Sequence, residues 1–320
     1  MSRRVLISGV GKRNALIQLM QVEADRYGIE IVGGDASELA PGRTSVAEFI
    51  RLPFARDPNF ATTFTDILRD KRIDAFLTLI DPEIPMLAGL ATTDDAKLAR
   101  CLHPVQETTL ICDDKYSFAK RMLADGIATI PTGLEPPTAL PFIRKDRCGS
   151  AGSGFRAFHK PEDVDAYRHE HEPGRHIFQP FHGGLHYCVD AYYSLYSNRL
   201  IDGCAKVILS KDKGESFVME SAKLDPFVEI LEKIGKTLPL RGIVNLDFFE
   251  DAGGLRIVEI NCRIGGNYPA CHAFGCNLIK HLFEETFVGR TFESSCFSCY
   301  SSGMRIGKYF GFSLPYKFSA

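Results

Sequence analysis

The stretch GIVNLDFFEDAGGLRIVEINCRIGG, residues 242–266, consists of two apolar runs around a glycine-rich turn. Two β-type runs joined by a short loop predict an antiparallel hairpin. If the loop is symmetric about Ala252, Asn245 lies opposite Glu259, and Asp247 lies on the diagonal, roughly 5–8 Å from Glu259. Because side chains alternate between the faces of a strand, one face is expected to carry Asn245, Asp247, Glu259 and Asn261.

This polar face stands out among Val, Ile and Phe, because an unpaired carboxylate is costly on a half-buried sheet. A hard cation such as Mg²⁺ removes that cost, since it takes oxygen ligands and leaves positions open for phosphate. Arg263, two residues after Asn261, suits a phosphate or acyl phosphate beside the ion. The alternative is a solvent-facing hairpin with its polar residues outward. A one-residue slip of register would also separate the polar residues of the two strands.

Length and composition restrict the class of protein. The chain has 320 residues, 45% hydrophobic and 24% charged, which is typical of an ordinary globular protein of two or three domains. The net charge of −2 gives no electrostatic reason to expect nucleic acid or an anionic membrane as a partner. No apolar run approaches the roughly 20 residues that span a bilayer.

The ten cysteines are scattered along the chain, and several lie in apolar runs. This usage favours reduced thiols in a cytoplasmic protein over a disulfide framework. Cys296 and Cys299 form the one C-x-x-C motif, and no second pair follows at zinc spacing, so a structural zinc site is not expected.

The N-terminal third predicts a parallel α/β layer. An apolar run at Val5–Val10, a helical pattern at Asn14–Tyr27 and a second run at Ile29–Val32 form a β-α-β unit. The turn at Gly9–Gly11 lacks the third glycine of a dinucleotide fingerprint and favours a tight strand-to-helix turn. The acidic turn Asp81–Glu83 ends a strand, where it either faces a ligand or begins a helix with Asp81 as the cap.

The middle of the chain carries a second motif. A helix is expected to open at Asp113–Lys115, and a strand at Leu140–Lys145 runs into a loop rich in glycine and serine at Cys148–Phe155. A lysine at the end of a strand before such a loop suits a phosphate cradle, with a flexible surface loop as the alternative. Further on, the three lysines of the 200–213 region are expected to be exposed: Lys206, Lys211 and Lys213.

In this order the pieces resemble the ATP-grasp superfamily, and most closely stand-alone ligases similar to one half of the carbamoyl-phosphate synthase large chain. The resemblance covers roughly residues 3–290, and the E-I-N-x-R motif at 259–263 is its most specific part. It implies an N-terminal parallel α/β (pre-ATP-grasp) domain, residues 1–108. A two-lobed ATP-grasp fold with mostly antiparallel sheets then follows, as a small lobe at 109–180 and a large lobe at 181–320.

The resemblance also implies roles for individual residues. Asp247, Glu259 and Asn261 correspond to the metal ligands, and Arg263 with Asn245 to catalytic groups on the phosphoryl group or substrate. The nucleotide is implied to contact Lys115, Lys145, Ser150, Gly152, Ser153, Gln179, Phe181 and His186. Two positions depart from the usual pattern: Pro180 and His186 stand where a hinge Glu and a ribose-binding Glu are common. Pro180 removes one N–H donor, and imidazole can still hydrogen-bond a hydroxyl.

Enzymes of this kind usually join a carboxylate to an amine through an acyl phosphate formed from ATP. The resemblance therefore implies an ATP-dependent carboxylate-amine ligase with ATP and Mg²⁺ as cofactors, Mn²⁺ being the alternative ion. A phosphotransferase, a C–O or C–S ligase, and a non-catalytic nucleotide-binding protein are the other functions to weigh. The expected partners are a small-molecule carboxylate and an amine, and a homodimer is left open.

Overall fold

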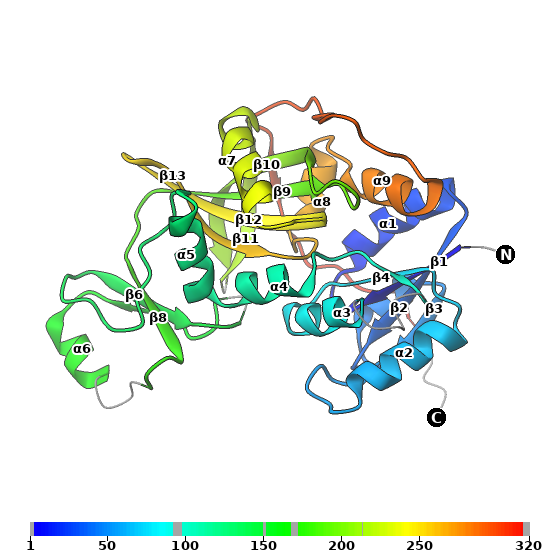
Figure 1. The fold of residues 1–320 in the computed structure, drawn as a ribbon, viewed down its shortest axis with the longest axis horizontal. Coiled ribbons are helices and arrows are strands. Elements are labelled where there is room, and N and C mark those ends of the chain that lie inside the picture. The colour runs from blue at the N-terminus through cyan, green and yellow to red at the C-terminus, as the bar shows by residue number, and fades with distance from the viewer. Residues whose placement is uncertain (1–2, 92–97, 150–151, 168–171, 213, 316–320) are drawn as a thin grey trace.

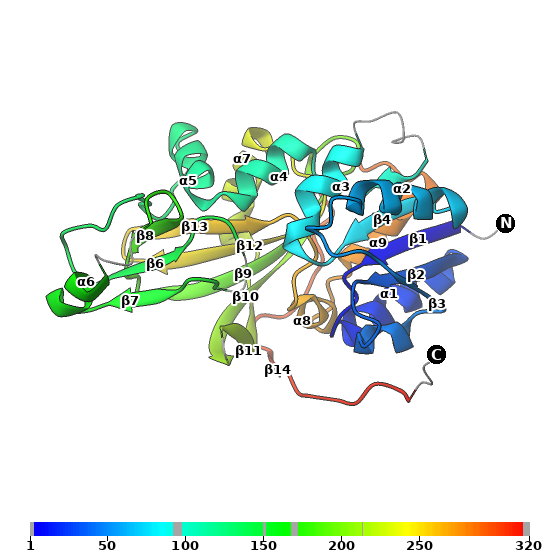
Figure 2. The same ribbon diagram turned by 90° about the horizontal axis from the view of Figure 1, so that it is seen from below.

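The computed structural model describes residues 3–91, 98–149, 152–167, 172–212 and 214–315, and its strands form three sheets (Figures 1 and 2). The sheet orders are β3-β2-β1-β4-β5, β7-β6-β8 and β13-β12-β9-β10-β11-β14. The strands are β1 (Arg3–Ser8), β2 (Ile29–Asp35), β3 (Glu48–Arg51), β4 (Ala75–Thr78), β5 (Arg100–Cys101), β6 (Phe142–Asp146), β7 (Arg156–Phe158), β8 (His176–Pro180), β9 (Leu185–Tyr193), β10 (Leu200–Asp212), β11 (Glu215–Ala222), β12 (Gly242–Asp251), β13 (Gly254–Asn261) and β14 (Arg305–Gly307). The α-helices are α1 (Asn14–Arg26), α2 (Phe60–Asp70), α3 (Ile84–Leu90), α4 (Gln106–Asp113), α5 (Lys115–Ala124), α6 (Pro161–Tyr167), α7 (Asp225–Thr237), α8 (Tyr268–Ala273) and α9 (Leu278–Phe283), and shorter turns lie at Pro41–Ser45, Asp81–Glu83 and Glu284–Val288.

The first sheet is parallel throughout, as the β-α-β pattern predicts. Alternate residues of β1 face opposite ways: Val5 and Ile7 pack toward α1, whereas Leu6 packs toward α2. Both faces are therefore covered, which a parallel sheet requires. The turn after β1 is the expected tight turn, because Gly9 and Gly11 have φ of 72° and 35° and the Gly11 N–H donates to Asp35 Oδ2 at 2.8 Å.

The six-stranded sheet is antiparallel and is covered unequally on its two faces. One face packs on α5 and α7 through side chains such as Phe118, Phe227 and Leu246. On the other face, Tyr192 and Ile243 belong to the core formed with α1, α8 and α9. The remainder of that second face is not covered by a helix of the described chain and borders a cavity. The mixed parallel and antiparallel architecture confirms the expected fold class.

The hairpin of β12 and β13 differs in register from the symmetric loop expected around Ala252. The pairing runs Asp251 to Gly254 at the turn and Phe248 to Ile257 further on, and then shifts so that Asp247 pairs with Glu259. Val258 is thus the extra residue of a β-bulge. The pairing is shifted by one residue near the turn and by one more at the bulge. A total shift of two residues returns the side chains of β13 to the face on which they were expected. The expected diagonal was wrong, and the expected shared face is confirmed.

One further expectation is confirmed and one is corrected. The helix expected to open at Asp113–Lys115 is α5, which Asp114 caps by accepting from the backbone N–H groups of Tyr116 and Ser117 at 3.0 and 3.1 Å, and a separate helix, α4, ends just before it. Lys206 is fully buried on β10, where its ammonium binds the Asp190 carboxylate. The sequence analysis expected an exposed lysine, because the residues around Lys206 on its own strand do not reveal that Asp190 on the neighbouring strand can pair with it.

His103 joins the N-terminal sheet to the large sheet. Its Nε2 accepts from the Thr78 N–H at the end of β4, and its Nδ1 donates to the Cys262 carbonyl just after β13, both at 2.8 Å. The ring is buried and uses both nitrogens, so it is neutral with the proton on Nδ1. Burial lowers the pKa of His103 from 6.5 to about 4.

This lowered pKa predicts acid sensitivity. The pKa of His103 is lower in the folded state than in the unfolded state. Its stabilising contribution to the free energy of unfolding is therefore complete above pH 6.5 and is lost as the pH falls toward 4. Between pH 7 and pH 5 we expect the wild type to lose about 2 kcal/mol more unfolding free energy than a non-titrating His103→Gln variant loses. Urea unfolding at the two pH values measures this. The control is the exposed His159→Gln, which should behave like the wild type; equal losses in His103→Gln would contradict the assignment.

The Lys206–Asp190 pair predicts a second stability effect. Lys206→Met leaves the Asp190 carboxylate buried without its cation, a change that costs about 3–5 kcal/mol. Lys211→Met on the exposed end of the same strand is the matched control, and it should change the unfolding free energy by no more than about 0.5 kcal/mol. Chemical denaturation at pH 7 gives both values. Similar stability of the two variants would show that the pair is not needed for the fold.

Candidate active site

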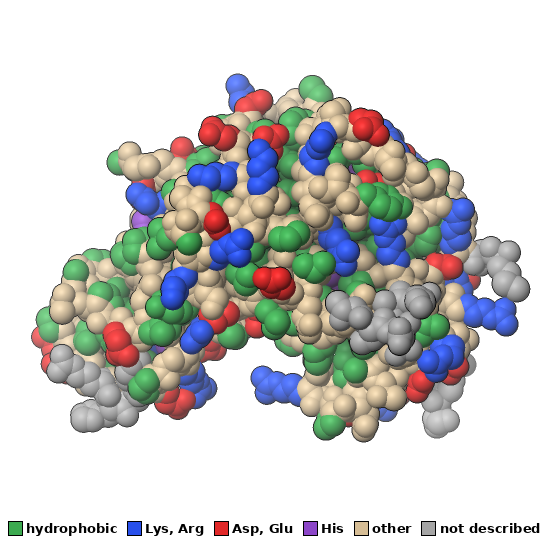
Figure 3. Space-filling model, in the orientation of Figure 1, with side chains coloured by type: hydrophobic (Ala, Val, Ile, Leu, Met, Phe, Trp, Pro, Cys, Tyr) green, Lys and Arg blue, Asp and Glu red, His purple; other side chains and the backbone are tan. Residues whose placement is uncertain are grey.

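A cavity of about 970 Å³ lies between the six-stranded sheet, the β7-β6-β8 sheet and the N-terminal domain. Figure 3 shows the surface hollowed between the end of the molecule that carries α6 and the N-terminal half. Every described residue of the expected site lines this cavity: Lys115, Lys145, Gly152, Ser153, Gln179, Phe181, His186, Asn245, Asp247, Glu259, Asn261 and Arg263. Ser150 lies outside the described residues.

The polar face of the hairpin forms one wall. Asn245 pairs with Asn261 and Asp247 with Glu259, so the two carboxylates stand directly opposite each other on neighbouring strands. Within the described chain, no group of three or more His, Cys, Asp or Glu side chains is arranged to hold a metal ion. The donor set here is instead two carboxylates and an amide oxygen, which are ligands that suit a hard cation retaining some of its water.

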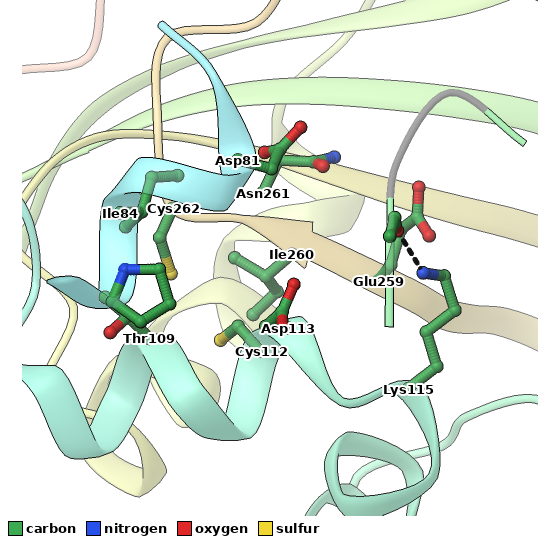
Figure 4. Close-up of a pocket in the computed structure, with 12 residues that line it drawn as sticks. Asp81, Ile84, Thr109, Cys112, Asp113, Lys115, Glu259, Ile260, Asn261 and Cys262 are labelled. Atoms are coloured by element: carbon green, nitrogen blue, oxygen red, sulfur yellow. Dashed lines mark hydrogen bonds between the residues drawn. The ribbon is translucent and has the colours of Figure 1, made fainter. Parts of the chain in front are cut away.

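Lysines from the opposite side approach the carboxylates. Lys145 on β6 is half-buried; desolvation lowers its pKa, and the nearby Glu259 and Asp247 carboxylates partly offset that effect. Lys115, the first residue of α5, donates to the Gly149 carbonyl of the glycine-rich loop, which is the dashed contact in Figure 4. Figure 4 also shows Lys115 and Glu259 around the same small side pocket, beside Asp113 and Cys112.

His186 contacts an expected metal ligand. Its Nε2 lies 2.8 Å from Asp247 Oδ1, and its ring stacks on Phe249 with centroids 4.9 Å apart. Its Nδ1 is buried and has no hydrogen-bond partner in the described structure. The sequence expects a ribose contact here, and the structure adds a direct link from this ring to the carboxylate wall.

The strand expected to serve as the adenine hinge has few free donors. Gln179 donates from its side chain to Thr132 Oγ1 at 3.0 Å, and the Phe181 N–H donates to the Pro141 carbonyl at 3.1 Å. Pro180 has no N–H. The Phe181 ring is 46% exposed and lines the cavity, so the hinge offers an apolar surface and backbone carbonyls to a ligand.

Asn245 is held from behind by the buried pair. Its amide donates to Asp190 Oδ1 at 2.8 Å, while Asp190 binds the Lys206 ammonium through its other oxygen. A methyl group placed at Gly265 would lie 2.7 Å from the Asn245 nitrogen, so the backbone packs tightly against this amide. The contacts that run from Lys206 through Asp190 to Asn245 therefore anchor a side chain of the cavity wall to a buried ion pair.

Arg263 is engaged by the N-terminal domain. Its guanidinium grips the Asp81 carboxylate with two contacts, Nε to Oδ1 at 2.7 Å and Nη2 to Oδ2 at 2.9 Å. Asp81 makes no side-chain cap at its helical turn, so the expected cap is wrong, because the carboxylate is committed to Arg263. The acidic turn faces a cation within the protein, and this pair joins the turn after β4 to the end of the E-I-N-x-R motif.

Three charged residues that the sequence did not single out also line the cavity: Arg13, Glu215 and Lys308. Arg13 follows the first strand of the parallel sheet, at the edge where such sheets bind ligands, so its position was a usable signal. Lys308 is delivered by β14, a short strand paired with β11, and nothing in its local sequence marks it.

Comparisons with known proteins agree with this architecture. Residues 5–99 match the family described as "PylC-like, N-terminal domain", and residues 112–267 match the "ATP-grasp domain". A 3-methyl-D-ornithine–L-lysine ligase of Methanosarcina mazei is 27% identical over 175 residues, 53% of this chain and 45% of the relative. The corresponding ligase of Methanosarcina acetivorans is 26% identical over 48% of this chain and 42% of the relative.

Solved structures share the fold. The biotin carboxylase domain of a Hydrogenobacter thermophilus 2-oxoglutarate carboxylase has a TM-score of 0.74 at 15% identity, covering 92% of this chain and 71% of that chain. An L-amino acid ligase from Bacillus licheniformis has a TM-score of 0.67 at 16% identity, covering 89% and 74%. The matches to the curated ligases span less than half of those relatives' length. By the two matching domains and the shared fold, the chain belongs to the ATP-grasp superfamily, with a PylC-like N-terminal domain ahead of its ATP-grasp domain.

Proposed function

We propose that this protein is an ATP-dependent carboxylate-amine ligase that forms an acyl phosphate and then a C–N bond. The observation that supports this most is the facing pair Asp247 and Glu259, with Asn261 beside it and Lys145 opposite, in one large cavity. A cation-lined and carboxylate-lined cleft of this kind suits the triphosphate of ATP with a divalent ion. The named activities of the relatives are consistent with it: two are amino-acid ligases by name.

In this proposal Asp247, Glu259 and Asn261 hold Mg²⁺, for which their oxygens are suitable donors. When bound, the ion neutralises charge on the nucleotide phosphates. The biotin carboxylase domain that shares this fold was crystallised with MgADP, ADP and bicarbonate. His186 then orients the Asp247 carboxylate through their 2.8 Å contact. Mn²⁺ is the alternative ion.

The protein's own residues do the remaining work by position and charge. Lys115 and Lys145 bind the phosphate chain, and Gly152 and Ser153 of the glycine-rich loop cover it and exclude water. Gln179 and Phe181 receive the base. Arg263 stabilises charge on the transferring phosphoryl group while Asp81 fixes its orientation. Asn245 donates its two amide hydrogens to Asp190 and Cys188, so it contacts the substrate through its side-chain oxygen.

The chemical sequence is balanced without a further reagent. A carboxylate oxygen of the acid substrate attacks the γ-phosphorus of ATP, and ADP leaves, giving the acyl phosphate. The nitrogen of the amine then attacks the acyl carbon, the C–O bond to phosphate breaks, and the amine loses a proton. The chain supplies orientation and electrostatic stabilisation for both steps.

We also propose that the chain divides after residues 108 and 180, into the N-terminal domain and the small and large lobes. The described structure contains no helix long and apolar enough to cross a membrane. A cytoplasmic location and a homodimer are further expectations of the proposal. The acid and amine substrates are small molecules, and the relatives' names make amino acids the first compounds to test.

The proposal predicts a turnover that depends on two substrates. Phosphate release from MgATP should rise only when an acid and an amine are supplied together, and Glu259→Gln should lower this rate by at least about 100-fold because one metal ligand loses its charge. The assay is a coupled phosphate measurement over a panel of amino acids, with circular dichroism as the check on folding. Glu229→Gln, exposed on α7, is the matched control and should retain the rate.

Two results would count against this proposal. Release that needs an acid but no amine would indicate a phosphotransferase. Full activity of folded Glu259→Gln, with unchanged dependence on Mg²⁺, would show that the carboxylate wall does not hold the ion.

A second prediction concerns the lysine that faces the carboxylate wall. Lys145→Ala should weaken MgATP binding by about tenfold or more, because a charge-assisted contact to phosphate is lost, while the thermal midpoint changes little. Titration calorimetry measures the affinity, with the exposed Lys160→Ala near the same sheet as control. Equal affinities for wild type and Lys145→Ala would show that the strand and loop do not cradle phosphate.

A further inference from the structure

The cavity contains a second cationic centre, separate from the lysines of the glycine-rich loop. The charges that act on Lys145 are those of Glu259, Lys115, Asp247 and Lys211. The charges that act on Arg13 are those of Arg263, Glu215 and Asp81. The two sets share no residue, so the cations of the cavity fall into two groups, one around Lys145 and one around Arg13.

Arg13 has no side-chain hydrogen bond or ion pair in the described structure, although its side chain is partly buried in the cavity wall. Its guanidinium lies against the backbone of Gly266, where an added methyl group would sit 2.2 Å from Nη1. Only glycine at 266 leaves room for this placement. The structure therefore holds a guanidinium at the cavity wall with no carboxylate of the described residues in ion-pair or hydrogen-bond contact, although Glu215 and Asp81 are near enough to act on its charge.

Lys308 belongs to the group around Arg13. Its backbone N–H donates to the Phe217 carbonyl at 2.9 Å, which fixes the strand, and its ammonium lies 3.6 Å from Glu215 Oε2. Glu215 is 75% exposed, so this ion pair is weak. Burial lowers the pKa of both Lys308 and Arg13, and each is lowered further by another cation: Arg13 by Arg263, and Lys308 by Arg13. An anion bound here would relieve that repulsion.

The size of the cavity agrees with a second occupant. Pockets for one drug-sized ligand usually measure about 300–1,000 Å³. At about 970 Å³ this cavity is at the upper limit, and its lining includes both Lys145 and Arg13. A nucleotide bound beside Lys145 would not account for the cations around Arg13.

We infer that Arg13 and Lys308 form an anion subsite that binds a carboxylate of a substrate, and that this carboxylate is not the one being activated. Planar guanidinium groups match carboxylates with two parallel hydrogen bonds, and Lys308 adds a point charge. The inference builds on the proposed ligase function by naming the substrate class: a compound with an acidic group remote from the bond that forms. The group belongs either to an amino acid that supplies the amine or to a dicarboxylic acid.

The test uses matched probe pairs and needs no turnover. Binding of L-lysine against cadaverine, and of glutarate against butyrate, is measured by ligand-observed NMR without nucleotide. We expect the member of one pair that has the additional carboxylate, L-lysine or glutarate, to bind the wild type more tightly than its partner, and Arg13→Gln to weaken its binding by about tenfold or more. The pair that responds identifies the source of the carboxylate.

The variants separate a specific subsite from general charge. Arg13→Lys should retain part of the affinity, and Gly266→Ala should reduce it by displacing the guanidinium, which keeps the test open if Arg13→Gln is unstable. Lys12→Gln is the control, since it removes one positive charge from an exposed neighbour and should bind like the wild type. If no probe binds the wild type, or if Arg13→Gln binds as tightly, the inference is wrong.

The outcome is independent of the ligase proposal. Binding that depends on Arg13, in a protein that shows no turnover dependent on acid and amine, would overturn the proposed function and leave the subsite standing. Turnover that depends on acid and amine, with KM values unchanged by Arg13→Gln, would support the proposed function and overturn the subsite.

Discussion

The site depends on one irregularity in the β12–β13 hairpin. Near the turn the pairing differs by one residue from the register expected for a loop symmetric about Ala252. Continued along the hairpin, this pairing would place Glu259 and Asn261 on the opposite face from Asp247. The bulge at Val258 adds one more residue and restores the face. Without it, a carboxylate and an amide would enter the apolar core beneath α5 and α7. The chemistry of the cavity wall and the integrity of the core are therefore settled by the same residue.

The unequal cover of the six-stranded sheet explains why polar residues are tolerated there. One face packs on α5 and α7, so its buried side chains are apolar. The other carries apolar side chains under α8 and α9, such as Tyr192 and Ile243, and polar ones where the helices end. Buried charges on this face have partners: Asp190 has Lys206 and Asn245. The same network that satisfies a charge in the core thereby reaches the cavity wall.

Local patterns in the sequence predict the elements and the polar face, because apolar periodicity and turn residues are local properties. They predict the helix at Asn14–Tyr27, which is observed as α1 at Asn14–Arg26. The family resemblance adds the nucleotide-contacting residues, and every described residue of the expected site lines one cavity. What they miss depends on contacts between distant segments. Lys206 is buried because Asp190 lies on the neighbouring strand, and Asp81 leaves its helix uncapped because Arg263 is 182 residues away. The β-bulge depends on how the two strands pair, so the sequence of neither strand alone predicts it.

The place of Lys308 has a consequence for how the protein is made. Arg13 lies in the turn between the first strand and α1, and Lys308 directly follows β14, yet both line the same cavity. During synthesis the N-terminal sheet can form while most of the chain is still unmade, since domains tend to fold as units from the N-terminus. The cavity, by contrast, gains its last wall only when β14 has left the ribosome and paired with β11. A nascent chain therefore carries Arg13 through the synthesis of roughly 300 further residues before Lys308 joins it at the cavity.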